Sequence, residues 1–132
     1  MAYRILAALI GTSIAAVPLP SAEVQAHRVR MVATQVLENQ IEDALMARSS
    51  RAAARAAKSL VPILADEEKY WDRTHLDDAL MYAQRNLAAA RSLAASTRRG
   101  NLSQASSELD SMRGNCVACH GRHPENRVVV GR

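Results

Sequence analysis

Alanine is the feature of this sequence that most limits its fold. Of the 132 residues, 25 are Ala and none is Phe. Ala has the highest helix propensity of the amino acids, and the five Gly and four Pro give its helices few interruptions. The composition therefore predicts an all-α protein, and the length suits a single domain.

Charge and cysteine content exclude several other classes of protein. The net charge is +4, with 15 Arg and two Lys spread along the chain rather than gathered in one stripe. We therefore expect no nucleic-acid partner, because such binding requires a basic patch. Two cysteines are too few for a disulfide-rich scaffold.

The N-terminus has the pattern of a secretory signal peptide. Arg4 precedes an apolar run, 5–17, which two prolines follow, and small residues then lead to Ala26. A membrane span needs about 20 apolar residues, so this run is shorter than a stable anchor. We expect residues 1–26 to be cleaved, with an uncleaved N-terminal anchor as the alternative. The mature domain, 27–132, contains no later apolar stretch long enough to span a membrane and is expected in the periplasm.

The mature sequence predicts four helices, which we expect to pack as an antiparallel four-helix bundle because short loops join them. Their expected ranges are about 28–47, 51–65, 74–97 and 102–123. The predicted boundaries are Ser49-Ser50, a charged connection at 66–72, a capping box at Thr74-x-x-Asp77, the Gly100-Asn101 stop and cap, and Pro124. Pro62 is expected to kink or shorten the second helix.

The helix seams of such a bundle are poor in large side chains. Only Tyr70, Trp71 and Tyr82 are aromatic in the mature chain, and the first two fall in the predicted connection. Protein interiors are packed to crystal-like density. Either the helices therefore approach very closely, or a large apolar group that is not protein fills the bundle.

The last predicted helix carries the sequence Cys116-Val117-Ala118-Cys119-His120, which is the C-x-x-C-H motif of c-type haem attachment. This spacing places two thiols on one face of a helix, where they can add across the two vinyl groups of haem. The adjacent His120 then supplies an axial nitrogen to iron.

Three other chemistries use similar residues. A thioredoxin-like C-x-x-C motif needs a βαβ context, and no strand is predicted here. A zinc site would combine Cys116 and Cys119 with His120 or His123, but structural zinc usually takes further ligands from a distant segment. A disulfide between the two cysteines would strain a helix. Together with the export signal and the apolar stripe, the spacing favours one haem c per chain.

These features resemble the class II cytochromes c, which include cytochrome c′. The resemblance rests on the motif near the C-terminus, on Gly100-Asn101 opening the last helix, and on Arg28 near the start of the first. It implies a haem attached to the C-terminal helix, inside the bundle, with its far face against the first helix. Members of this family transfer electrons with a Met as the sixth ligand, or leave that position open to small gases. Many of them dimerise through their first two helices.

The first predicted helix offers three candidate residues for the far side of the expected haem. Helical phase places Val32 inside and Met31 at the edge of the apolar arc, and the family's spacing from Arg28 also selects Val32. We therefore expect Val32 as the distal contact. Met31 is an alternative sixth ligand of the iron, and His27, one turn earlier, is a further one.

The other polar candidates have expected roles at the edge of the site. His75 is expected at the surface or as a helix cap, and His123 is expected near a helix end, where a cation suits the dipole. Arg113 and Arg122 are candidates to pair with haem propionates.

Electron transfer with a redox partner protein is the function these features favour. A five-coordinate protein that binds NO or CO is the alternative, and a homodimer is the expected assembly by family resemblance. We expect no enzymatic activity, because the sequence suggests no paired carboxylates or His–carboxylate pair on the distal side.

Overall fold

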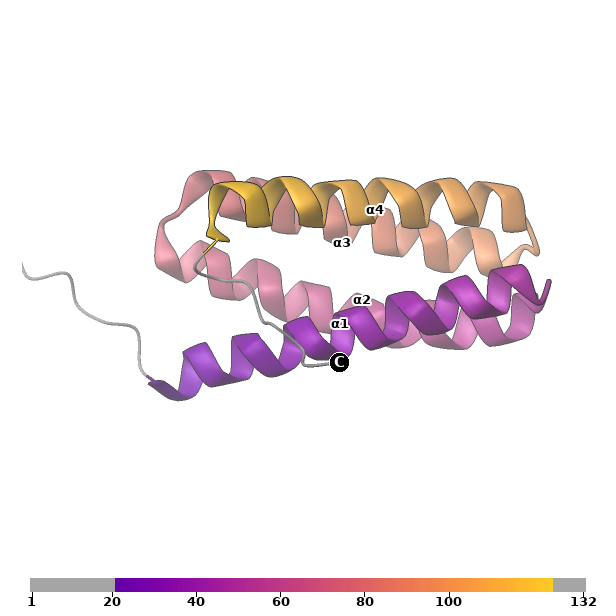
Figure 1. Ribbon diagram of the computed structural model, residues 1–132, viewed down its shortest axis with the longest axis horizontal. Coiled ribbons are helices and arrows are strands. Elements are labelled where there is room, and N and C mark those ends of the chain that lie inside the picture. The colour runs from indigo at the N-terminus through magenta and orange to yellow at the C-terminus, as the bar shows by residue number, and fades with distance from the viewer. Residues whose placement is uncertain (1–20, 125–132) are drawn as a thin grey trace, which may run out of the picture.

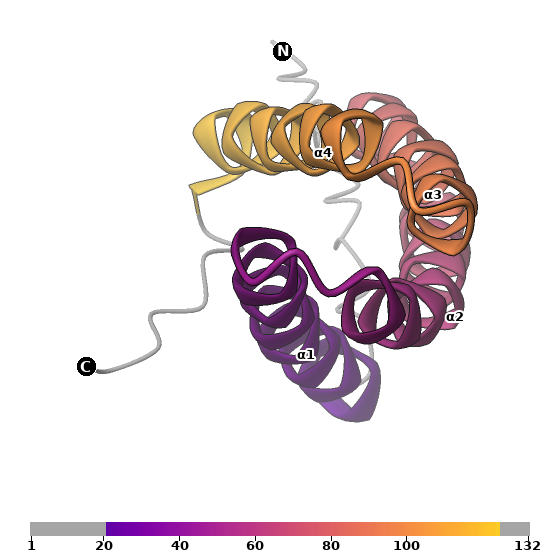
Figure 2. The same cartoon turned by 90° about the vertical axis from the view of Figure 1, so that its right-hand side faces the viewer.

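Four helices make up residues 21–124, the part of the chain that the computed structural model describes. They are α1 (Ser21–Met46), α2 (Ser50–Thr74), α3 (Asp77–Arg98) and α4 (Leu102–Arg122). Each helix runs antiparallel to the next, and α4 returns to lie across from α1 (Figures 1 and 2). The predicted all-α four-helix bundle is confirmed.

Side-chain caps begin two of the helices where the sequence predicted them. The Ser49 side chain accepts a hydrogen bond from the Ala52 amide at 3.3 Å, and Asn101 accepts one from the Gln104 amide at 3.1 Å. Gly100 has φ 73°, a left-handed conformation that Gly adopts without a Cβ clash. These local signals fix where α2 and α4 start.

The start of α1 differs from the prediction. The helix begins at Ser21 rather than near Arg28, and Glu23 in its first turn lies 3.5 Å from Arg73 of α2. The expected boundary after Ala26 therefore falls inside α1. Residues 1–20, which hold most of the predicted signal peptide, lie outside the described residues.

The charged connection predicted at 66–72 is wrong, because α2 continues through it to Thr74. Leu64, Glu67 and Trp71 follow one another at helical spacing and are buried, so tertiary packing extends the helix past its charged residues. Pro62 lies within α2 and does not end it. Tyr70 is therefore a buried helical residue rather than a loop residue.

The capping box predicted at Thr74 is also wrong. The Thr74 hydroxyl donates to the Trp71 carbonyl at 2.7 Å and so belongs to the end of α2. Leu76 precedes α3 with no side-chain cap, and the Asp78 carboxylate instead accepts from the Ala79 amide at 2.9 Å. The turn contains His75 at φ 57°.

The hydrophobic core is divided into two clusters. The larger cluster is rich in Ala and Leu and fills the bundle from its middle towards the α3–α4 turn. A smaller cluster closes the opposite end, with aromatic rings from α2 against alanines of α3. The larger comprises Ile41, Ala56, Ala57, Leu60, Leu64, Leu87, Ala89, Ala90, Leu93, Ala105, Leu109 and Met112, and the smaller comprises Tyr70, Trp71, Ala79 and Ala83.

Packing along the helix seams is uneven. The α2–α3, α3–α4 and α1–α2 seams are close, whereas α1 and α4 share far fewer contacts. Close approach of Ala faces thus fills most of the bundle, and the α1–α4 seam is its loosest part. Within residues 21–124, no helix combines the length and the apolar character needed to cross a bilayer.

Candidate cofactor site

All four helices line a cavity of about 50 Å³ near the end of the bundle where α1 starts and α4 finishes (the left-hand end in Figure 1). From α4 the cavity receives Cys116, Cys119 and His120. These are the three functional residues of the C-x-x-C-H motif, so one helix face presents the predicted attachment residues to one space. The cavity separates the two core clusters, because Leu64 of one and Trp71 of the other both line it.

The α1 wall of this cavity consists of His27, Met31 and Thr34, and Val32 is not among the lining residues. Helical phase had placed Val32 inside and Met31 at the edge, and the structure has Met31 at the cavity instead. The phase argument took the valines of α1 as its inner face, but Val29 is 60% exposed and Val36 is 48% exposed. The inward-facing side of α1 is polar at this end of the helix. The hydrophobic pattern therefore assigned the wrong side of α1 to the bundle interior.

Three buried polar atoms lack a hydrogen-bond partner among the described residues, and all three belong to side chains that line the cavity. They are His27 Nε2, Thr34 Oγ1 and Asn86 Oδ1. Buried polar groups in folded proteins are almost always paired. The cavity therefore suits an occupant that supplies donors, acceptors or a metal to these atoms.

A buried ion-pair cluster holds one side of the cavity. Glu67 is 2% exposed and accepts from Nδ1 of His27 at 2.6 Å and from Nε of Arg30. The His27 ring stacks on Tyr70 with 4.6 Å between centroids, and its edge meets Trp71 at 5.2 Å. The sequence suggested no His–carboxylate pair, whereas the structure forms one at this cavity, between His27 and Glu67.

The Cys116 thiol lies between two polar side chains. It donates to Glu38 Oε1 at 3.8 Å and accepts from Asn86 Nδ2 at 3.4 Å. Burial, together with the negative charge of Glu38, raises the pKa of Cys116 to about 12. The thiol is therefore protonated at neutral pH, unlike the low-pKa cysteines of disulfide oxidoreductases.

Glu38 and Arg113 continue this polar network between α1 and α4. Burial raises the pKa of Glu38, and the nearby Arg113 only partly opposes that effect. Arg113 makes two hydrogen bonds of 2.9 Å to the Glu42 carboxylate. This residue, expected to meet a propionate, thus bridges the loose α1–α4 seam in the structure.

The remaining candidates lie around the end of the bundle that holds the smaller core cluster. Arg122 Nη1 is 3.9 Å and His123 Nε2 is 3.1 Å from the Asp78 carboxylate. His75 is exposed in the α2–α3 turn and does not line the cavity. Within residues 21–124, no group of three or more His, Cys, Asp or Glu side chains is arranged to hold a metal ion by itself.

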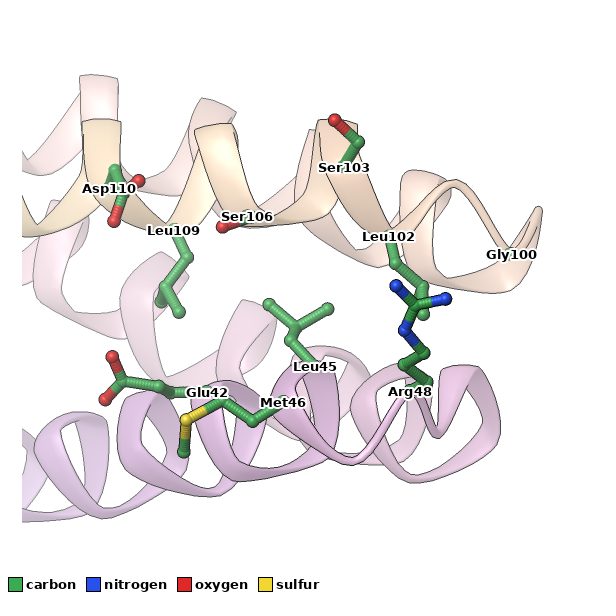
Figure 3. Close-up of a pocket in the computed structure, with 10 residues that line it drawn as sticks. All are labelled: Glu42, Leu45, Met46, Arg48, Gly100, Leu102, Ser103, Ser106, Leu109 and Asp110. Atoms are coloured by element: carbon green, nitrogen blue, oxygen red, sulfur yellow. The ribbon is translucent and has the colours of Figure 1, made fainter.

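A second hollow, a groove of about 600 Å³, lies at the other end of the α1–α4 seam (Figure 3). Leu45 and Leu109 point towards one another across it, with Glu42, Arg48 and Asp110 around them. None of the predicted site residues lines this groove, so it is separate from the candidate site.

The sequence analysis missed Glu67, Glu38, Asn86 and Thr34. Glu67 was assigned to a connection, although its spacing from Leu64 and Trp71 was a signal that the helix continues. The other three are polar residues within predicted helices, and nothing local marks them as inward-facing. No family model, curated protein or solved structure matches the chain.

Proposed function

We propose that the protein is an exported monohaem c-type cytochrome of the class II kind that transfers electrons in the periplasm. The observation that carries this proposal is the gathering of Cys116, Cys119 and His120 on one cavity inside a four-helix bundle. Three buried polar atoms without partners line the same cavity. The resemblance to class II cytochromes c gives the same architecture.

The donor set fits haem c in its chemistry. Two thiols and an imidazole lie within five residues of α4, and α1 adds the Met31 thioether and the His27 imidazole on another wall. Burial and the charge of Glu38 raise the pKa of Cys116 to about 12, which makes it a weaker candidate for disulfide exchange, because that reaction needs the thiolate.

The space must widen for a macrocycle to enter. A cavity of about 50 Å³ holds a few water molecules. Widening is easiest at the α1–α4 seam, which has the fewest contacts of the four seams between neighbouring helices. The main ion pair across that seam joins Arg113 and Glu42. Both side chains are partly exposed, so water can hydrate them when the seam opens.

In this proposal the chain attaches, orients and encloses its cofactor. Cys116 and Cys119 would hold the haem through thioether bonds, each sulfur joined to one carbon of a vinyl group and its proton to the other. His120 would supply an imidazole nitrogen to the iron. Haem c, when bound, supplies one-electron exchange between ferrous and ferric iron. Leu64 and Trp71 give the cavity apolar walls, and the polarity around a haem influences its reduction potential.

The lining of the cavity favours electron transfer over gas binding. A five-coordinate protein needs an apolar residue such as Val32 over the iron, whereas the α1 wall here offers two side chains of types that ligate haem iron, His27 and Met31. A six-coordinate iron exchanges electrons with little rearrangement and resists small gases. We also propose that the protein exchanges electrons with a redox partner protein, that it forms a homodimer, and that its signal peptide is cleaved after Ala26.

Expression in a host that matures c-type cytochromes tests this function. After acid–acetone extraction, the haem should remain with the polypeptide, and the protein should cycle reversibly between two oxidation states. Ferrous protein should keep its spectrum under CO. Haem that partitions into the solvent would refute covalent attachment, and ready CO binding would favour the gas-binding alternative.

A further inference from the structure

His27 is buried more deeply than its place near the start of α1 suggests. Its side chain is 4% exposed, and its Nε2 atom has no hydrogen-bond partner among the described residues. A histidine nitrogen in such surroundings needs a proton donor, a proton acceptor or a metal to satisfy it.

The other ring nitrogen has a fixed role. Glu67 is paired with Arg30, and its carboxylate accepts from Nδ1 of His27 at 2.6 Å. Since an ionised carboxylate can only accept, the proton of a neutral His27 lies on Nδ1. Nε2 then presents a lone pair. Metal-ligating histidines are commonly held in this way, with a carboxylate fixing the tautomer and the ring orientation.

The ring is also held rigidly. It lies parallel to Tyr70 within 7°, and Trp71 meets it at an angle of 81°. Met31 has a thioether on a flexible, unbranched chain, and Val32 has no donor atom and does not line the cavity. His27 is therefore the preorganised donor on the α1 wall.

Contacts with Trp71 show where His27 lies along the axis of the bundle. The Trp71 ring lies 5.2 Å from the ring of His27 on α1 and 6.3 Å from that of His123, the residue that caps the C-terminus of α4. His27 is thus level with the last turn of α4, to which His120 also belongs. The two histidines approach the same cavity from α1 and α4.

We infer that His27 is the sixth ligand of the haem iron, through Nε2, so that the iron has two histidine ligands. This inference rests on the proposed function, because it requires haem attached at Cys116 and Cys119. Glu67 acts as a positioning residue for the ligand.

The test uses haem-loaded wild-type protein and three variants, His27→Ala, Met31→Ala and His75→Ala. The last removes an exposed histidine and serves as the matched control. Optical and EPR spectra of the ferric proteins should show low-spin, bis-imidazole iron in all except His27→Ala, which should be high-spin. Added imidazole should restore the low-spin spectrum of His27→Ala, and this rescue separates lost ligation from a merely disturbed fold.

Two results would overturn the inference while leaving the proposed function intact. One is attached haem that is high-spin in the wild-type protein. The other is a low-spin spectrum with the far-red band of Met ligation, lost in Met31→Ala and kept in His27→Ala. A wild-type polypeptide that carries no covalent haem would instead refute the proposed function, and this inference with it.

Discussion

Replacing Glu67 by Leu tests the buried cluster on which the site depends. Leu has nearly the volume of Glu but no hydrogen-bond acceptor. The substitution leaves Nδ1 of His27 buried without an acceptor, whereas Arg30, whose side chain is 21% exposed, can turn towards water. The effect on stability should therefore come mainly from His27.

The expected destabilisation follows from these two exposures. A buried donor left unsatisfied costs about 1–3 kcal/mol. Loss of the partly exposed Arg30 pair adds at most about 1 kcal/mol, because solvent screens it. We therefore expect Glu67→Leu to lower the free energy of unfolding by about 1–4 kcal/mol. For a domain of this size, each kcal/mol corresponds to a fall in Tm of about 4–8 °C.

Urea and thermal unfolding, followed by far-UV circular dichroism at neutral pH, measure this effect. Glu68→Leu, at the adjacent position on α2, is the matched control and should stay within about 0.5 kcal/mol of wild type. The double variant His27→Leu/Glu67→Leu should be more stable than Glu67→Leu, because the buried imidazole donor is removed together with its acceptor. Equal stability of Glu67→Leu and wild type would refute the argument.

Three further predictions concern other parts of the structure. Burial raises the folded-state pKa of Glu38 above 4.5, so its stabilising contribution is complete below pH 4.5 and is lost as the pH rises through the raised value. The free energy of unfolding of Glu38→Gln, relative to that of wild type, should therefore rise between about pH 4 and about pH 8 in urea unfolding. The same difference between the two proteins at both pH values would contradict this. Asn101→Ala removes the side-chain cap of α4 and should lower the free energy of unfolding by about 1 kcal/mol, which corresponds to a fall in Tm of about 4–8 °C. The control Ser103→Ala, at an exposed position, should lower it much less. Equal Tm values for the two variants would count against the cap. The Cys116→Ser/Cys119→Ser variant, without attached haem, should melt earlier and less cooperatively than the haem-loaded wild type in calorimetry, and identical transitions would show that haem contributes no burial.

The sequence predicted the fold well because the signals for it are local. Ala-rich segments, the caps at Ser49 and Asn101 and the stop at Gly100 each act within a few residues. The end of α2 was missed because its continuation depends on burial of Glu67 and Trp71 against other helices, which local composition does not report.

The site was predicted on one side only. The motif on α4 identified Cys116, Cys119 and His120 because their spacing is itself the signal. The α1 wall was misjudged because its inner face carries polar residues, so that a hydrophobic pattern selected Val32 where the structure has Met31 and His27. Such polar inner positions are explained by long-range partners such as Glu67, 40 residues from His27.

Intact-mass spectrometry of the exported protein tests the central claim most directly. The protein would be purified from the periplasm of a host that matures c-type cytochromes and measured under denaturing conditions, beside the Cys116→Ser/Cys119→Ser variant. The account predicts that wild type has the mass of residues 27–132 plus one haem, and that the variant has the mass of its chain alone. A wild-type mass equal to the unmodified chain, with haem supplied and a control cytochrome matured in the same cells, would contradict it.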